Sequence, residues 1–480
     1  MLSPNSHSRA NVKLTIPQKI RLFLLYSFPV VLFCSYYPLI SIASTESTNY
    51  ELSLPLIWLF LFSVLSLKDF ASAIHNIYKN HRPYLLSFLF PLYLSTTIIW
   101  SANPLRATLT AGILWCIIIT SLTILTKYKA QSFFDKAKFI KIFLISSLCF
   151  CTLCWVQSIL DCLGIDRNIT LLCPGCTSYS FGFPHPSGLA IEPQFMGNLL
   201  LAPTLTALCL WARPAAKAHF FSRRALLFFS FFFSSTLFLT FSRGAIYSFT
   251  LGFIVLTLLS LIRLHNRAFL KTIPLLLLSF IFTLLMQGVF SAISYTNSTF
   301  ASGIERSVSQ LSLGEINLHF SNTDSDPATI DPSNSIAPVF DGYVEESTDV
   351  RVNLNRIAID LATKSPSTLL FGYGLGSAGK VMFQAEKTST PFEIIQNEYL
   401  SLLLETGILG LLLAVLITTL ILLALRHIAR PERYLIGCTV LCYLLTLLFF
   451  SGFPNAIHLY LSPVFLAASL LQRRPHRSSL

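Results

Sequence analysis

Two arginines are the side chains in this sequence best suited to binding a charged substrate. Arg243 stands in a tight Ser-Arg-Gly connection between two apolar runs, and Arg351 lies at the edge of an apolar stripe with helical spacing. A guanidinium is always charged and binds phosphate oxygens through paired hydrogen bonds. Held close together, the two would form a clamp for a pyrophosphate that needs no metal ion. Arg356 is the alternative to Arg351, although its spacing turns it away from the stripe. The structural alternative for Arg243 is to extend toward lipid head groups.

Three carboxylates are candidates for acting on such a substrate. Glu192 stands at the mouth of one apolar run, and Glu398 stands at the start of another. Glu405 lies seven residues, or about 10 Å of helix rise, inside that second run. An ionisable side chain at such a depth is a functional candidate by default. Its structural alternative is a packing role, hydrogen-bonded to a neighbouring helix beside Gly407 and Gly410. His185, in a loop near Glu192, receives no assignment.

The residues around Arg351 form a predicted helix followed by a glycine-rich loop. Apolar residues recur at helical spacing at Val350, Leu354, Ile357 and Leu361. Thr348 or Asp349 can cap the start of this helix, and Pro366 closes it. In the loop that follows, glycines allow the backbone to approach a ligand closely, at Gly372, Gly374 and Gly376. A dinucleotide-binding fingerprint would need a preceding strand, and none is predicted.

The elements that must position these residues are membrane-spanning helices. Of the 480 residues, 53% are hydrophobic and only 12% are charged, whereas an average soluble domain has about 25% charged residues. This composition argues against a water-soluble enzyme, a disordered chain and a nucleic-acid-binding domain, despite a formal net charge of +12.

The predicted fold class is an all-α polytopic membrane protein with about 12 transmembrane helices. A helix needs about 20 apolar residues to cross a bilayer. Such runs occur near 22–43, 52–67, 84–100, 105–126, 140–160, 189–211, 225–241, 244–262, 272–294, 399–425, 434–452 and 455–472. The first run is longer than the apolar region of a signal peptide. We therefore interpret it as an uncleaved helix, although Ser41-Ile42-Ala43 weakly resembles a cleavage site.

The distribution of charge predicts that both termini are cytoplasmic. With the N-terminus inside, 25 of the 34 basic residues and only 3 of the 22 acidic residues fall on the cytoplasmic side. This is the bias that the positive-inside rule requires. The net positive charge therefore reports orientation rather than affinity for nucleic acid, and Arg243 and Arg351 are among the few bases on the other side.

One connection, 295–397, is far longer than the others, and loops beyond about 15 residues are usually functional. The predicted organisation is a tail (1–21), helices 1–9 (22–294), the large outer loop (295–397), helices 10–12 (398–472) and a second tail (473–480). The acidic first part of the loop, 322–349, indicates a solvated surface more than a calcium site. In a second outer loop, Cys173 and Cys176 form either a local disulfide or a turn with two free thiols; a zinc site would need two more ligands.

The order and sidedness of these motifs resemble the superfamily of O-antigen ligases and O-antigen polymerases. The resemblance rests on Thr240-Phe241-Ser242-Arg243-Gly244-Ala245, the arginine-led helix before Phe371-Gly372-Tyr373-Gly374-Leu375-Gly376, and Gln396-Asn397-Glu398-Tyr399-Leu400 with Glu405-Thr406-Gly407-Ile408-Leu409-Gly410. It is best over about 235–415. It implies a multi-pass protein of the bacterial inner membrane with a large periplasmic loop.

The resemblance also implies an activity, which is transfer of a glycan from undecaprenyl pyrophosphate to an acceptor hydroxyl. No nucleotide sugar, cofactor or metal is expected. Arg243 and Arg351 would bind the pyrophosphate and stabilise it as the leaving group. Arg356 is the alternative to Arg351 in this role. The expected partners are the lipid-linked saccharide, membrane lipid and a chain-length regulator, with no nucleic acid.

One position departs from the family pattern. Ligases of the family carry a histidine, proposed as general base or acceptor-orienting group, where this chain has Gln396. An amide accepts a hydrogen bond from a hydroxyl but does not take its proton. Either Glu398, Glu405 or Glu192 serves as the base, or departure of the pyrophosphate drives the reaction with little base assistance.

The departure at Gln396 favours a polysaccharide polymerase that extends lipid-linked O-antigen, capsule or exopolysaccharide. A sister hypothesis is a ligase that moves the finished glycan to lipid A core or to protein. A flippase or secondary transporter would share the topology. However, transporters often have two related halves with charges near the bilayer midplane, whereas here no repeat relates residues 1–240 to 241–480.

Overall fold

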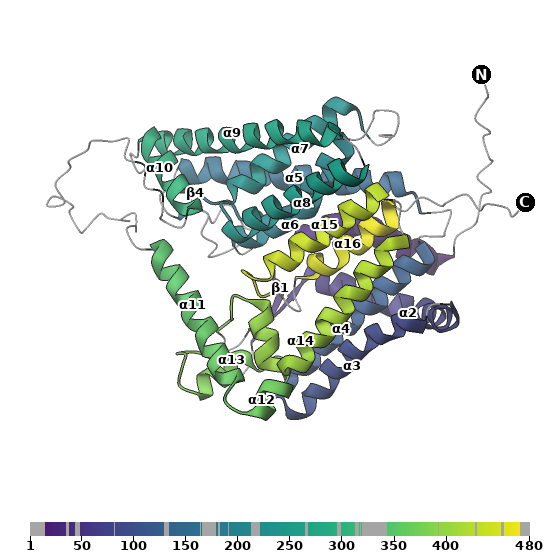
Figure 1. Ribbon diagram of the computed structural model, residues 1–480. Helices are drawn as coiled ribbons and strands as arrows, with labels where there is room; N and C mark the ends of the chain where they lie inside the picture. Colours follow the sequence, from purple (N-terminus) through teal and green to yellow (C-terminus); the bar gives the residue numbers. More distant parts are fainter. Residues whose placement is uncertain are drawn as a thin grey trace, which may run out of the picture.

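A computed structural model gives the three-dimensional arrangement of the chain (Figure 1). It describes residues 15–34, 38–43, 49–80, 82–128, 134–163, 165, 179–180, 183–190, 192–212, 221–264, 267–294, 299–312, 316, 318, 343–391, 393–427, 430–452 and 456–470. The two short sheets are antiparallel pairs, β1 (Pro38–Ala43) with β2 (Asn49–Ser53) and β3 (Tyr179–Ser180) with β4 (Phe183–Pro184).

All other long elements are helices. They are α1 (Ile16–Val31), α2 (Leu54–Asn80), α3 (Leu89–Thr96), α4 (Pro104–Thr123), α5 (Lys136–Cys162), α6 (Pro193–Trp211), α7 (Arg223–Leu239), α8 (Arg243–Leu264), α9 (Thr272–Ile293), α10 (Phe300–Leu311), α11 (Tyr343–Ala362), α12 (Pro366–Phe371), α13 (Ala378–Gln384), α14 (Glu398–Ala424), α15 (Arg430–Thr446) and α16 (Ile457–Leu470).

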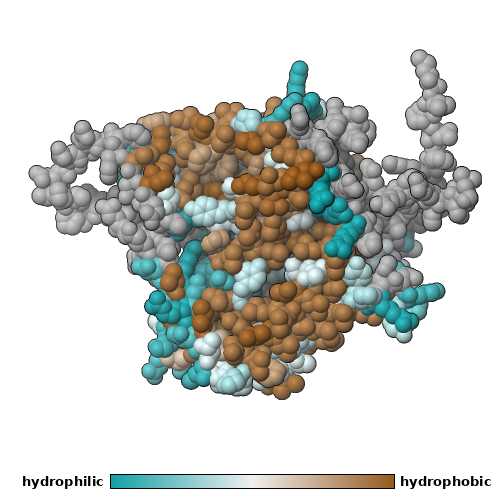
Figure 2. All heavy atoms as spheres, in the orientation of Figure 1, coloured by the Kyte–Doolittle hydropathy of each residue, from teal (hydrophilic) through white to brown (hydrophobic). Residues whose placement is uncertain are grey.

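The chain is an all-α multi-pass membrane protein, as its composition predicts. Within the described residues, nine helical segments are long and apolar enough to cross a bilayer. Each of the twelve predicted spans overlaps a helix, but α7, α15 and α16 have only 17, 17 and 14 residues. The count of twelve therefore stays a prediction. Figure 2 shows a broad hydrophobic band over the helices, with hydrophilic residues gathered at its two ends.

The end of the first predicted span is wrong. Helix α1 and the 3-10 turn after it stop at Cys34, and residues 38–43 form strand β1 instead of continuing the helix. Ile40 pairs with Leu52 and Ile42 pairs with Tyr50 of strand β2. Pro38 cannot supply the backbone N–H of a helix interior, and the β-branched isoleucines favour a strand. The apolar run therefore divides into a helix and a hairpin.

Helix α6 lies at the centre of the bundle and carries Glu192 just before its first residue. It is the most buried of the nine segments, because 83% of the residues in its most apolar 18-residue stretch are buried inside the protein. It contacts α5, α7, α8 and α15. An α6 that is apolar on nearly all sides suits either lipid or a protein interior, and here protein surrounds most of it. The start of α6 is consequently held rigidly next to the start of α8.

Helices α11, α12 and α13 form a second, smaller unit that packs against α14 (Figure 1). Its core contains Leu354, Ile357 and Leu361 of α11 together with Met382 and Leu404. The predicted amphipathic helix is therefore confirmed, although Val350 is 53% exposed. The predicted cap is wrong, since α11 begins at Tyr343 and both Thr348 and Asp349 lie inside it. Polar residues such as Glu and Ser reduce helix stability only slightly. The first apolar residue of a helix therefore does not have to be its first residue.

The long connection 295–397 contains more structure than its sequence indicates. Besides α11, α12 and α13 it contains α10, which folds back on α9 with Phe300 close to Gly288. Most of the acidic stretch 322–349, together with Cys173 and Cys176, lies outside the described residues, so the calcium and disulfide hypotheses stay predictions.

Candidate functional site

Glu405 holds the glycine loop, which we define as residues 371–379. Its Oε2 accepts a hydrogen bond from the Gly376 N–H (2.8 Å), and its Oε1 accepts one from the Ala378 N–H (3.1 Å). The same loop is bound from the other side by α4 and the turn before it, where Ser101 donates to the Leu375 carbonyl (2.8 Å). Glu405 thus has the hydrogen-bonded packing role that was its structural alternative, with one partner before α13 and the other at the first residue of α13.

The glycine loop crosses α14 at a point where two backbones touch. Gly407 has φ +67° and ψ −172° and kinks α14, and Gly372 has φ +69°. A Cβ on Gly372 would overlap the Glu405 and Thr406 backbone, and one on Gly407 would overlap Leu370 and Phe371. Both the conformation and the contact therefore require glycine.

The partners that the loop glycines approach are parts of this chain. A Cβ on Gly374 would overlap Ser101, and one on Gly376 would press on Arg106. The prediction that Gly372, Gly374 and Gly376 bring backbone close to a ligand stays untested. What the structure describes is a loop clamped between α4 and α14.

Replacing Gly407 with alanine should destabilise this crossing. The positive φ alone costs about 1–3 kcal/mol for a side-chain-bearing residue, and the overlap with Leu370 adds to it. We expect a lower midpoint of thermal unfolding, followed by fluorescence-detected size exclusion in detergent. Gly112→Ala in α4 is the matched control, because a Cβ there meets nothing within 4 Å and alanine favours a helix. Equal midpoints for the two variants would contradict the crossing.

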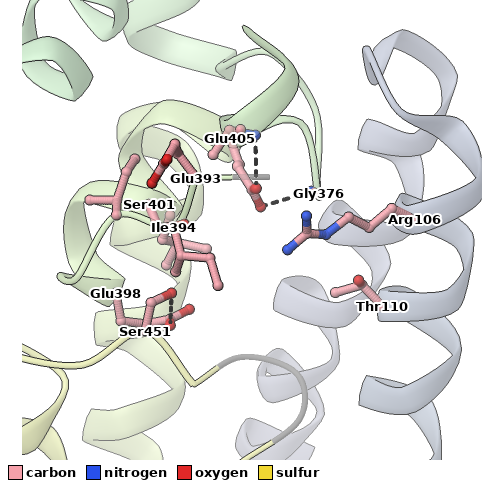
Figure 3. A pocket seen from close by; sticks show the side chains of 13 residues that line it. Arg106, Thr110, Gly376, Glu393, Ile394, Glu398, Ser401, Glu405 and Ser451 are labelled. Carbon is pink, nitrogen blue, oxygen red and sulfur yellow. Dashed lines mark hydrogen bonds between the residues drawn. The ribbon is translucent and has the colours of Figure 1, made fainter. Parts of the chain in front are cut away.

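Arg106 reaches toward Glu405 from the opposite helix (Figure 3). It lies in the first turn of α4, and its charge acts on the Glu405 carboxylate. Among the described residues the guanidinium has no hydrogen bond. Arg106 and Thr110 line one side of a cavity whose other side is formed by α14 and the segment before it, with Glu393, Glu398 and Ser401.

Glu398 binds a segment that we call the 447–452 segment, which follows α15. Its Oε2 accepts hydrogen bonds from Ser451 Oγ (3.0 Å) and from the Gly452 N–H (2.9 Å). The same segment contacts the starts of α6 and α8, because Gln194 donates to the Phe449 carbonyl (2.6 Å) and a Cβ on Gly244 would touch the Phe449 ring. Glu398 is thus joined through this segment to the neighbourhood of Arg243.

Arg243 is held at the first residue of α8 by an unusual turn. Phe241, two residues earlier, has φ +46°, a conformation that costs a bulky residue energy and is typical of functional sites. Gly197 of α6 fits so closely against Ser242 and Ala245 that a Cβ there would press on both. The turn is therefore fixed against α6, and the half-buried Arg243 side chain has little freedom in where it begins.

His185 supports the same turn from behind. It is 3% exposed, its ring lies 5.8 Å from that of Phe241, and it is hydrogen-bonded to the Thr240 backbone. Burial lowers the pKa of His185 to about 3, although the hydrogen bond opposes this shift. The imidazole is therefore neutral near pH 7 and acts as a packing group rather than as a cation.

Arg351 of α11 and Glu192 at the start of α6 lie within electrostatic range of each other. Burial raises the pKa of the Glu192 carboxyl, and the positive charge of Arg351 opposes that shift. Glu192 is nevertheless an exposed residue, so the surrounding protein desolvates its carboxyl only in part. Neither side chain has a hydrogen bond within the part of the chain that the structure describes.

The other two predicted residues are Arg356, on α11, and Gln396, before α14. Arg356 is exposed on α11, as its spacing predicts, and is turned away from the buried stripe of that helix. Gln396 lies half-buried just before α14 and next to Asn397, whose Oδ1 accepts from Tyr399 N–H and so caps the helix. The charge of Arg351 thus acts on Glu192, Arg243 is fixed beside α6, and none of these three residues lines the cavity that Glu405 lines.

Sequence reasoning missed Arg106 and the 447–452 segment. Arg106 has the same sequence signal as Arg243. Each is a basic residue at a short connection on the predicted outer side, where the positive-inside bias leaves few bases. The 447–452 segment has no such signal, since Phe449 and Phe450 continue an apolar run. Its role depends on contacts with Glu398 and Gln194, which are distant in sequence.

Comparison with known proteins identifies the family to which this site is related. Residues 228–415 match the model of a family described as O-Antigen ligase. The match confirms the resemblance to the O-antigen ligase and polymerase superfamily, and it spans Arg243, Arg351, the glycine loop, Gln396 and Glu405. Arg106 and Glu192 lie outside the matched residues. A comparison with curated proteins gave no match.

Proposed function

We propose, from this relationship to O-antigen ligases and polymerases, that the protein is a glycan transferase whose donor is an undecaprenyl-pyrophosphate-linked saccharide. The observation that carries the proposal is the family match over residues 228–415, which includes both Arg243 and Arg351; the charge of Arg351 also acts on Glu192 at the start of α6. The start of α8, with Arg243, packs against the same end of α6. We call Arg243, Arg351 and Glu192 the donor clamp, with its carrier lipid in the bilayer and its saccharide beneath α11.

The charges of the donor clamp suit a pyrophosphate. Two guanidinium groups and one carboxylate leave a net positive charge, and each guanidinium can bind two phosphate oxygens. In the reaction, an acceptor hydroxyl attacks the anomeric carbon of the donor sugar and forms the new glycosidic bond. The bond from that carbon to the pyrophosphate oxygen breaks, and its electron pair leaves with undecaprenyl pyrophosphate. Arginines that stabilise this developing charge lower the barrier.

Of the three candidate carboxylates, Glu192 is the best placed to take the proton of the hydroxyl. Glu405 already accepts two backbone hydrogen bonds, and Oε2 of Glu398 accepts two from the 447–452 segment. Glu192 has no hydrogen bond among the described residues, and burial raises its pKa. A base is most effective when its pKa lies nearer the working pH, so this environment favours Glu192.

We propose polymerisation of O-antigen, capsule or exopolysaccharide units on the periplasmic face of the inner membrane. A ligase is the second candidate, favoured by the description of the matched family. The two are separated by deleting the gene and analysing the carrier lipid. We expect single repeat units to remain, as in the loss of a polymerase. Accumulation of long chains on the carrier lipid would instead establish the ligase.

A further inference from the structure

A cavity of about 40 Å³ lies apart from the donor clamp, between α4, the glycine loop and the start of α14 (Figure 3). None of the three clamp residues lines it. Ile394, on its rim, is 50% exposed, so the cavity reaches the surface of the protein. It is therefore a separate, accessible site on the same membrane protein.

Two hydroxyl groups of this cavity have no hydrogen-bond partner among the described residues. Thr110 lines the cavity although its side chain is only 5% exposed, and Ser401 faces it from α14. A threonine in a helix commonly bonds to the carbonyl four residues earlier, as Thr108 does to Pro104 at 2.8 Å, but Thr110 does not. The Thr110 oxygen is not among the fully buried unpartnered atoms, so this hydroxyl is open to the cavity and available to a group that enters it.

The charge of the cavity excludes a pyrophosphate. Its lining includes three carboxylates, Glu393, Glu398 and Glu405, against one cation, Arg106. A doubly charged anion would be repelled here, whereas the donor clamp has the opposite balance. Carboxylate and hydroxyl oxygens instead accept hydrogen bonds from hydroxyl groups, and a guanidinium donates to them. This lining fits an uncharged, hydroxyl-rich ligand.

The size of the cavity limits how much of such a ligand enters. A cavity of about 150 Å³ holds a benzene ring, so one of 40 Å³ admits the hydroxyl-bearing edge of a sugar ring and not the whole ring. The position is also suitable, because Ser451 lines the cavity and belongs to the 447–452 segment. Phe449, two residues earlier in the same segment, contacts Gly244 beside Arg243.

We infer that this cavity binds the acceptor saccharide through the hydroxyl edge of an uncharged sugar. The inference rests on the proposed glycan transfer and adds to it a second subsite, separated from the donor clamp by the 447–452 segment. Thr110 and Ser401 hydrogen-bond the sugar, and Arg106 completes the set of donors. The diphosphate of the donor is directed to Arg243 and Arg351 by the same charge difference.

The test measures the acceptor KM and the donor KM separately. The purified full chain in nanodiscs receives undecaprenyl-pyrophosphate-linked saccharide as donor, and the same saccharide released from its carrier by mild acid as soluble acceptor and competitor. For Thr110→Val we expect the acceptor KM to rise about 3- to 10-fold, the loss of one neutral hydrogen bond, with an unchanged donor KM. Ser401→Ala should give the same separation if Thr110→Val does not fold. Thr108→Val is the control, because Thr108 is exposed on the same helix.

The outcomes distinguish this subsite from the proposed function. An unchanged acceptor KM in both variants, or an equal rise of the donor KM, would overturn the subsite while transfer by the wild type still supports the proposed function. Absence of any transfer by the wild type, with donor binding also absent, would overturn the proposed function itself.

Discussion

Arg243→Lys should reduce the rate of glycan transfer by about 100- to 1,000-fold, the loss that follows removal of one donor to a developing oxyanion. Lysine keeps the charge but not the planar fork that binds two phosphate oxygens. The turn that holds the residue depends on Phe241, Ser242 and Gly197 rather than on the guanidinium. Expression and thermal stability should therefore stay close to those of the wild type.

The measurement is the initial rate of transfer by purified protein with a lipid-linked saccharide. Arg263→Lys is the matched control, since Arg263 is an exposed arginine at the opposite end of the same helix. A wild-type rate for Arg243→Lys would show that Arg243 only anchors α8, and the pyrophosphate would have to bind elsewhere.

Glu192→Gln should lower kcat by about 100- to 10,000-fold, the usual contribution of a general base. Glutamine preserves the shape of the side chain and removes its basicity. The donor KM should not rise, because the substitution removes a negative charge from beside Arg351. A fall in kcat without a rise in KM separates a proton acceptor from a binding residue.

The pH dependence of the wild type provides an independent check on Glu192. A base works only when deprotonated, so the rate should rise with pH through the pKa of Glu192 and level off above it. Burial places this rise above the ordinary value of 4.5. Glu386→Gln, at an exposed carboxylate, should retain the wild-type profile. If Glu192→Gln keeps the full rate and the same profile, departure of the pyrophosphate drives the reaction without this base.

Local pattern predicted those parts of the fold that depend on neighbouring residues. The spacing of Leu354, Ile357 and Leu361 correctly predicted a helix with one buried face, because burial repeats with the helical period. The first span was wrong after Cys34, since strand β1 forms through pairing with β2, and hydropathy does not report pairing. The start of α11 was wrong for a similar reason, because its first turns are polar.

The site depended on contacts that no local pattern contains. Glu405 was identified from its depth in a span, but its partners Gly376 and Ala378 belong to a loop that precedes the span. Arg106 acts on Glu405 from a helix about 300 residues earlier in the chain. Gly372 indicated close approach to a ligand, and only the fold shows that Gly372 and Gly407 each approach the other's backbone segment.

The most direct test of the account is competition for the donor clamp. Purified protein in nanodiscs is incubated with radiolabelled undecaprenyl-pyrophosphate-linked saccharide, and unlabelled undecaprenyl pyrophosphate or undecaprenyl monophosphate is added. A pyrophosphate clamp should make the pyrophosphate displace the donor at least about tenfold more effectively than the monophosphate. This preference should be lost in the double variant Arg243→Lys with Arg351→Lys. Equal displacement by the two lipids, or a preference that survives in the double variant, would contradict a pyrophosphate clamp at Arg243 and Arg351.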